Sequence, residues 1–398
     1  LCNCADCGNK CAFSCGGTGC EEIADVTTGS EHTCAIARES ASLGGSVVCW
    51  GSNSAGQLGN GTNRGSDVPV RVLELTNVTA VAAGNNHSCA IVDGLVSCWG
   101  SNLRGQLGIG TTDDGFSFPI NALPPFGAEQ AERIASGAFH TCAIYDGGRL
   151  ACWGQNDFGQ LGNGDQGDGV INRAPTPVKR ELGGQYLDII NASQVTAGES
   201  HTCALSEGIV ECWGANFSGQ LGREVQDPPV ARSVPGLDGL TVDEIRASGF
   251  HTCARAGFRV YCWGSNEDGE LALEAVERAP PTRIPLPEDV VSIATGLFFG
   301  CALGASGQIH CWGSSEFGER GTNGPALGVA PNPLPLEGVA DLFAGGGKHL
   351  CALAGSSQLS CWGRNKFGQL GIGRKSDGQE PLATAVVPLN GPRVCVND

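Results

Sequence analysis

Cysteines are the residues of this chain whose spacing most clearly indicates chemistry. If Cys89 faces Cys98 across an antiparallel hairpin, Asp93-Gly94 remains as a two-residue turn, a dipeptide that such turns prefer. Directly opposed residues in this geometry have Cα atoms about 4.5 to 5.5 Å apart, and a disulfide tolerates roughly 4.4 to 6.8 Å. The spacing therefore predicts a disulfide across the hairpin.

The same hairpin occurs seven times, which indicates a repeat architecture. Differences in spacing are confined to the turn, with two residues at 207–208 and 257–258, three at 146–148, 305–307 and 355–357, and an insertion at 38–45. The predicted disulfide pairs are Cys34 with Cys49, Cys89 with Cys98, Cys142 with Cys152, Cys203 with Cys212, Cys253 with Cys262, Cys301 with Cys311, and Cys351 with Cys361.

An odd number of cysteines lies outside these pairs, so one thiol is free or one bond leaves the molecule. A cysteine-rich N-terminal segment, 1–21, supplies most of them. It either cross-links onto its own domain or joins a neighbouring subunit, and a metal site is less favoured in an oxidised chain. The candidate assembly residues are Cys2, Cys4, Cys7, Cys11, Cys15, Cys20 and Cys395.

Composition restricts both the partners and the compartment. The formal net charge of −17 disfavours nucleic acid and anionic membranes as partners. Paired cysteines in such numbers indicate an oxidising compartment, so we expect a secreted, periplasmic or surface-exposed protein. The sequence has no methionine and no apolar run long enough for a signal or membrane helix. We therefore expect Leu1 to be an end left by processing.

Each repeat predicts about four short antiparallel strands. An apolar strand ending in small residues, as at 78–84, is followed by a His-Thr-Cys-Ala strand, a Cys-Trp-Gly strand, a Gly-Gln-Leu-Gly turn and a strand containing proline, as at 68–73. Both faces of the central hairpin are largely apolar, which favours sheets stacked against each other around an axis. The predicted fold is an all-β, seven-bladed β-propeller over 22–398, with C-terminal closure and one hairpin disulfide per blade.

These recurring motifs resemble the regulator of chromosome condensation repeat over about residues 22–390. The resemblance implies a seven-bladed propeller that acts as a binding platform, and in its secreted habit the chain is similar to the β-lactamase inhibitory propeller. An asparagine follows the Cys-Trp-Gly strand in every repeat except the sixth, where Ser315 replaces it. The histidine position is occupied by His32, His87, His140, His201, His251 and His349, with Phe299 in the sixth repeat.

Two rings of repeated residues could be mistaken for functional sites. One large aromatic residue per repeat is better explained as a spacer between blades than as a ligand-stacking ring. The histidines could bind metal or transfer protons, but catalysis needs one site with different residues in different roles, so we predict a structural function. The tryptophans are Trp50, Trp99, Trp153, Trp213, Trp263, Trp312 and Trp362.

The Gly-Gln-Leu-Gly turn changes in two repeats. Glutamine side chains are expected to bind backbone groups within the turn, at Gln57, Gln106, Gln160, Gln220 and Gln369. Glu270 and Glu319 replace glutamine in the fifth and sixth repeats, so the conformation of those turns, and the outline of that side of the ring, are expected to differ. The acidic loops 113–115 and 164–169 could coordinate calcium, but solvated turns are favoured.

The sequence supports one leading function and two alternatives. We expect a non-enzymatic extracellular structural or binding protein without a cofactor, which self-assembles into a disulfide-stabilised fibre or surface layer through its N-terminal cysteines. One alternative is a soluble enzyme inhibitor or adhesin that binds a foreign protein through its loops, favoured if aromatic and polar residues project from one mouth of the propeller. The other, a lyase or hydrolase with a site in the central channel, has only the histidine ring in its support.

Overall fold

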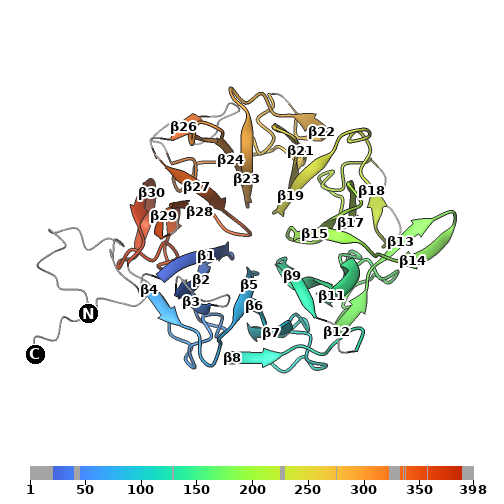
Figure 1. Ribbon diagram of the computed structural model, residues 1–398, viewed down its shortest axis with the longest axis horizontal. Coiled ribbons are helices and arrows are strands. Elements are labelled where there is room, and N and C mark those ends of the chain that lie inside the picture. The colour runs from blue at the N-terminus through green and yellow to red at the C-terminus, as the bar shows by residue number, and fades with distance from the viewer. Residues whose placement is uncertain are drawn as a thin grey trace, which may run out of the picture.

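Seven four-stranded antiparallel sheets surround one axis in the computed structural model (Figure 1). The structure describes residues 21–39, 45–127, 130–224, 229–274, 276–321, 332–334, 336, 338–355 and 357–387. Each sheet is one continuous stretch of chain, and blades 1 to 7 follow in sequence order. The predicted seven-bladed propeller is confirmed.

Within each blade the first strand in the chain lies nearest the axis and the fourth lies farthest from it. The innermost strands are β1 (Glu21–Thr28), β5 (Val78–Ala83), β9 (Ala131–Ser136), β15 (Ala192–Ala197), β19 (Val242–Ser248), β23 (Val290–Gly296) and β27 (Val339–Phe343). The second strands are β2 (His32–Glu39), β6 (His87–Val92), β10 (His140–Tyr145), β16 (His201–Ser206), β20 (His251–Ala256), β24 (Phe299–Gly304) and β28 (His349–Ala354).

The remaining two strands of each blade complete the sheets. The third strands are β3 (Ser46–Gly51), β7 (Leu95–Gly100), β11 (Arg149–Gln155), β17 (Ile209–Gly214), β21 (Arg259–Ser265), β25 (Ile309–Gly313) and β29 (Gln358–Asn365). The outermost strands are β4 (Ser66–Arg71), β8 (Phe116–Asn121), β12 (Ile171–Pro177), β18 (Arg232–Ser233), β22 (Arg278–Arg283), β26 (Asn332–Leu334) and β30 (Ser376–Ala385).

The register of the central hairpin agrees with the prediction in every blade. Cys89 faces Cys98 and Val92 faces Leu95, which leaves Asp93-Gly94 as the turn. All seven pairs form disulfides with Cα atoms 4.0 to 4.1 Å apart, closer than expected. Counting back from the two-residue turn places Cys89 and Cys98 at a non-hydrogen-bonded pair, the closer of the two antiparallel pair types.

The ring closes by packing between blades 7 and 1, since no strand is exchanged between sheets. Val26 and Trp50 of blade 1 share a buried cluster with Leu359 and Leu370 of blade 7. Equivalent clusters lie between the other neighbouring blades. The hydrophobic core is therefore divided into seven slabs, each lying between two sheets.

One hairpin lies outside the repeat and was not predicted. A 3-10 turn, η1 (Asp146–Gly148), joins β10 to β11 as expected, but β13 (Lys179–Leu182) and β14 (Gln185–Asp188) form a separate two-stranded sheet between blades 3 and 4. In Figure 1 this sheet projects outward from the ring. The Gly183-Gly184 dipeptide, with both φ angles positive, is a hairpin signal that the sequence already contained.

The candidate assembly residues lie outside the described residues: Cys2, Cys4, Cys7, Cys11, Cys15, Cys20 and Cys395. No helix in the described part of the chain combines the length and apolar character that crossing a membrane requires.

Candidate functional site

The tryptophans fasten each blade to the one before it. All seven are buried, with at most 1% of the side chain exposed, which confirms the spacer prediction. Each indole Nε1 donates a hydrogen bond of 2.7 to 3.0 Å to the backbone carbonyl of residue 57, 106, 160, 220, 270, 319 or 369, in the turn of the preceding blade. The bond from Trp50 to Gln369 closes the ring.

Five of the interfaces add a second contact to the same carbonyl. The Thr33 hydroxyl donates to the Gln369 carbonyl at 2.8 Å and lies 2.8 Å from Nε2 of His349 in the preceding blade. Since the hydroxyl uses its single hydrogen on the carbonyl, it accepts from Nε2–H, which assigns the tautomer. The other four sets join Ser88 to Gln57 and His32, Thr141 to Gln106 and His87, Thr202 to Gln160 and His140, and Thr252 to Gln220 and His201.

Burial keeps the histidine ring neutral. All six side chains are fully buried, and desolvation lowers each pKa from 6.5 to about 3 or about 4. A neutral imidazole that donates through Nε2 to a hydroxyl is a structural group, because it carries no charge near pH 7 and does not face solvent. The structural interpretation of the histidines is supported.

The glutamine side chains bind the backbone of their own turn, as predicted. Gln57 Oε1 accepts from Ala55 N at 3.0 Å, and the four other glutamines repeat this bond. Glu270 and Glu319 make the same bond through a carboxylate oxygen at 2.8 Å. These turns keep their conformation, although burial raises the pKa of both carboxyls and Ala272 takes a left-handed φ of 51°. The expected difference in turn conformation is therefore absent.

Two interfaces lack the second contact altogether. Between blades 5 and 6, Gly300, which has no hydroxyl, occupies the repeat position of the threonine, and Glu270 is the carbonyl residue. Between blades 6 and 7, Phe299 and Leu350 replace the histidine and threonine and pack in one buried cluster, with Glu319 as the carbonyl residue. All these changes from the repeat pattern therefore occur at two adjacent interfaces.

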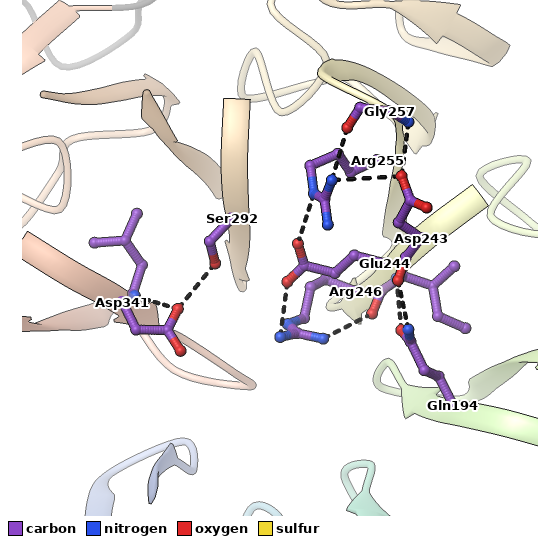
Figure 2. Close-up of polar contacts among 10 residues, drawn as sticks. Gln194, Asp243, Glu244, Arg246, Arg255, Gly257, Ser292 and Asp341 are labelled. Atoms are coloured by element: carbon purple, nitrogen blue, oxygen red, sulfur yellow. Dashed lines mark hydrogen bonds and ion pairs between the residues drawn. The ribbon is translucent and has the colours of Figure 1, made fainter. Parts of the chain in front are cut away.

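The innermost strands carry an asymmetric polar cluster near the axis (Figure 2). Glu244 on β19 is paired with Arg246 at 2.8 Å and with Arg255 at 3.2 Å, and Arg255 also contacts Asp243. The Ser292 hydroxyl donates to the Asp341 carboxylate at 2.9 Å. The two arginines are paired with carboxylates within blade 5, and the Ser292–Asp341 bond joins the inner strands of blades 6 and 7, so the cluster has a structural character.

Further side chains of the inner strands bind the backbone of the next blade. Gln194 exchanges two hydrogen bonds with β19, donating to the Asp243 carbonyl and accepting from Ile245 N (Figure 2). Thr196 accepts from Ala247 N at 2.8 Å. Desolvation raises the pKa of Asp25 on β1 to about 6, while the positive charge of Arg246 opposes the shift. A cavity of about 140 Å³ where these strands end is smaller than the roughly 300 to 1,000 Å³ of ligand pockets.

One face of the propeller bears a cluster of cations and aromatic rings. The loops after the first and third strands of each blade lie at the same end of the sheets, and we call this end the GQLG face. At blades 6 and 7, the Lys348 ammonium lies 5.0 Å from the Phe298 ring centroid and 4.9 Å from that of Phe317. The Arg364 guanidinium lies 5.5 Å from Phe317 and 5.6 Å from Phe367.

Carboxylates border this cation–aromatic cluster. Glu316 binds the Lys348 ammonium at 2.7 Å, and Glu31 of blade 1 binds Arg364 at 3.4 Å. Lys366, which is exposed, lies 5.8 Å from the Phe367 ring centroid. Three cations are thus grouped on a chain whose net charge is −17. Elsewhere on the same face, Phe158 and Phe217 meet edge to face at 5.1 Å, and 60% of Phe217 is exposed.

The acidic loops make hydrogen bonds within their own blades. Asp114 accepts from Asn102 N at 2.6 Å, and Asp157 accepts from Gly169 N at 2.8 Å. The repeated asparagines hold the same loops, since Asn156 donates to the Asp165 carbonyl and accepts from Leu161 N. Within the described residues no group of three or more potential metal ligands converges.

Comparison with protein-family models gives the family directly. The RCC1-like domain model matches residues 13–288, and a regulator of chromosome condensation (RCC1) repeat matches residues 290–319. The chain belongs to the RCC1-like domain family. The resemblance noted in the repeat motifs is therefore confirmed, and the seven-bladed ring is the expected fold of an RCC1-like propeller.

Curated relatives and solved structures agree with this assignment. The chain is 32% identical over 204 residues to the ultraviolet-B receptor UVR8 of Arabidopsis thaliana, covering 50% of this chain and 43% of the relative. It is 35% identical over 204 residues to human HERC4, a probable E3 ubiquitin-protein ligase, covering 51% and 18%. Yeast Prp20p superposes with a TM-score of 0.72 at 23% identity, over 86% of each chain. This chain spans less than half the length of the curated relatives it matches.

The cation–aromatic cluster of this RCC1-like propeller was missed by the sequence analysis. A usable signal was present, because the residue before the histidine position varies from repeat to repeat while the histidine position itself changes only in the sixth. At that position the chain has Glu31, Asn86, Phe139, Ser200, Phe250, Phe298 and Lys348. Variable residues in an otherwise uniform repeat mark the side chains that the fold leaves free for function.

Proposed function

We propose that this chain is a non-enzymatic, exported binding propeller that docks a partner protein on the cation–aromatic cluster of its GQLG face. The cluster itself carries the proposal. Phe298, Phe317 and Phe367 are half-buried, so each ring is held in place while an edge stays accessible. Aromatic and arginine side chains of this kind dominate the binding energy of protein interfaces.

The position of the cluster supports the same function. It spans blades 6 and 7, beside the two interfaces at which the polar network is lost. Relatives also support protein binding, because the yeast propeller Prp20p is described for binding to Gsp1p and histones and has been crystallised with Kap60. Near the axis, the pairing of Arg246 and Arg255 with Glu244 supports a structural role there.

A binding experiment tests the proposed surface. The purified protein is used as bait in extracellular fluid from its source, bound proteins are cross-linked and identified, and the direct affinity of the main partner is measured. The double variant Phe317→Ser/Lys348→Glu should weaken that affinity at least about tenfold, which corresponds to about 1.4 kcal/mol. Phe258→Ser, at an exposed hairpin turn on the opposite face, is the matched control. Equal affinity for both variants would exclude this surface.

Export to an oxidising compartment is the second part of the proposal. Its support is the set of seven cross-strand pairs at bonding distance. Alkylation of intact cells followed by mass mapping should find these cysteines as disulfides. Free thiols at those positions would contradict the compartment while leaving the binding surface untouched.

Covalent self-assembly through the N-terminal cysteines stays a prediction, because those residues lie outside the described part of the chain. Gel mobility with and without reductant tests it directly. Polymers that dissolve on reduction would support a fibre or surface layer. A monomer under both conditions would remove covalent assembly and leave a soluble binding propeller.

A further inference from the structure

Proline protects the outer rim of the propeller. An outermost strand exposes backbone N–H and C=O groups to which another chain could add, and proline blocks this because it lacks the N–H. Six of the seven outermost blade strands contain at least one proline. These residues are Pro69 in β4, Pro119 in β8, Pro175 and Pro177 in β12, Pro280 and Pro281 in β22, Pro333 in β26 and Pro381 in β30.

The exception, β18 in blade 4, is covered by the additional hairpin. Arg180 of β13 forms a bridge with Ala231, next to β18, and Ala231 N donates to the Lys179 carbonyl at 2.8 Å. The Arg180 guanidinium binds Glu211 and Ser206 of blade 4, and Arg232 of β18 pairs with Glu181. Strand β13 thus closes the edge of blade 4 and leaves β14 as the outer edge.

Strand β14 has no such protection. Its sequence, Gln-Tyr-Leu-Asp, contains neither proline nor lysine, and all four residues are exposed. Among the described residues β14 pairs with β13 alone. The hairpin that contains β14 projects outward from the ring in Figure 1.

Hairpin geometry shows which backbone groups are free. Leu182 faces Gln185 across the two-residue turn, and Arg180 faces Leu187. These are the hydrogen-bonded pairs of such a hairpin, so the N–H and C=O groups of Tyr186 and Asp188 point away from β13. Half of Tyr186 (54%) and nearly half of Leu187 (45%) are exposed beside this free edge.

We propose that β14 pairs with β14 of a second copy of this chain, forming a four-stranded sheet across a two-fold axis. The strand complements itself in one antiparallel register. With Leu187 opposite its own counterpart, Tyr186 lies opposite Asp188 of the second copy, and these two residues exchange hydrogen bonds through their free backbone groups. The leucines meet at the axis, where cross-strand apolar pairs stabilise a sheet.

The other registers that respect the two-fold axis are less favourable. Sliding by two residues in one direction places Asp188 opposite Asp188 of the second copy, and like charges directly opposed are destabilising. Sliding the other way places Tyr186 opposite itself and Asp188 opposite Gly184 of the turn, so one hydrogen-bonded pair within the strands remains in place of two. A contact between two four-residue strands is small for a stable interface, so the fraction of dimer should depend on protein concentration.

Two substitutions test the pairing in the intact protein. Sedimentation equilibrium is measured after alkylation of free thiols, with non-reducing gels to exclude disulfide-linked species. Tyr186→Pro removes only an outward N–H, so the hairpin is kept while dimer affinity should fall at least about tenfold, whereas Tyr186→Thr keeps the N–H and should retain dimerisation. Leu187→Lys places two positive charges opposite each other at the two-fold axis and should also dissociate the dimer.

Matched controls and a backbone readout make the result decisive. Leu95→Lys adds the same charge at a similarly exposed strand position in blade 2 and should leave association unchanged. Hydrogen exchange at the Tyr186 and Asp188 amides should slow as protein concentration rises, with that of Leu187 unchanged. A wild-type chain that stays monomeric at the highest concentration, or a Tyr186→Pro or Leu187→Lys chain of unchanged affinity, overturns the proposal.

Discussion

The interfaces between blades fall into two groups. At five of them a histidine, a hydroxyl residue and a glutamine carbonyl form one buried polar network. At the 5/6 interface Gly300 replaces the hydroxyl residue, and at the 6/7 interface Phe299 packs with Leu350. The tryptophan bond is present in both groups. The tryptophan bond is thus common to the whole ring. The polar network is replaced by an apolar pair at the 6/7 interface, where both partners change, and is lost at the 5/6 interface, where the histidine is kept.

The largest expected effect is the pH dependence of stability. Because burial lowers the histidine pKa values to about 3 or about 4, the unfolded chain binds protons below pH 6.5 that the folded chain does not. Stability is full above pH 6.5 and should fall progressively as the pH decreases towards 4, because the unfolded histidines are protonated there and the folded ones are not. Denaturant unfolding at pH 7, 6 and 5 with intact disulfides measures the slope.

Buried carboxyls oppose this trend, because burial raises the pKa of Asp25, Glu31, Glu199, Glu211, Glu270 and Glu319. The pKa of Asp25 is raised to about 6, so protonation of Asp25 between pH 6 and pH 4 favours the folded state. The six histidines are fully buried, and among the carboxyls only Asp25 has a comparably large shift, so the net slope should remain positive. Replacing His201 by Phe together with Thr252→Leu should reduce it, whereas a stability that rises on acidification would contradict the assignment of neutral histidines.

A substitution at the glycine beside the histidine should have the next largest effect. A Cβ on Gly84 would lie 2.2 Å from Cε1 of His87 and 2.6 Å from the Gly137 carbonyl oxygen, so Gly84→Ala should cost about 3 kcal/mol. At Gly296 the nearest atoms all belong to the Phe299 ring, so Gly296→Ala should cost less. Thermal unfolding compares the two, with Gly378→Ala, where nothing lies within 4 Å, as the control.

A double-mutant cycle then tests whether the two kinds of interface are interchangeable. Thr252→Leu alone leaves the His201 Nε2–H without its acceptor and should cost about 2 kcal/mol. Adding His201→Phe recreates the Phe299–Leu350 pair, so the double variant should be more stable than the sum of the single effects by about 1 kcal/mol or more. Strict additivity would show that the histidine and threonine do not act as a unit.

The smallest effect concerns the tryptophan bond itself. The Gln160 carbonyl accepts from both Trp213 and Thr202, whereas at the 5/6 interface the Glu270 carbonyl accepts from Trp312 and a glycine occupies the repeat position of the hydroxyl residue. Trp312→Phe should therefore cost about 1 kcal/mol more than Trp213→Phe, because it leaves a buried carbonyl unpaired. Equal losses in chemical denaturation would show that the hydroxyl contributes nothing to that carbonyl.

Much of this fold could be predicted because its signals are local. The spacing of Cys89 and Cys98 around Asp93-Gly94 fixes the hairpin register by counting, and two apolar faces on one hairpin require neighbours on both sides. The β13–β14 hairpin was missed because it interrupts the repeat, although the dipeptide Gly183-Gly184 indicates its turn. The partner of each histidine was missed for a different reason: His32 and Ser88 are 56 residues apart and meet only across a blade interface.

By itself, the sequence determined the strand pattern, the number of blades and the pairing of fourteen cysteines, since each depends on residues close together along the chain. Only the tertiary structure decided which residues meet between blades. It joined Phe299 to Leu350, gathered Lys348, Arg364 and Phe317 on one face, and left β14 as the unprotected edge. Contacts between blades depend on how the sheets are rotated about the axis, and no short stretch of sequence encodes that rotation.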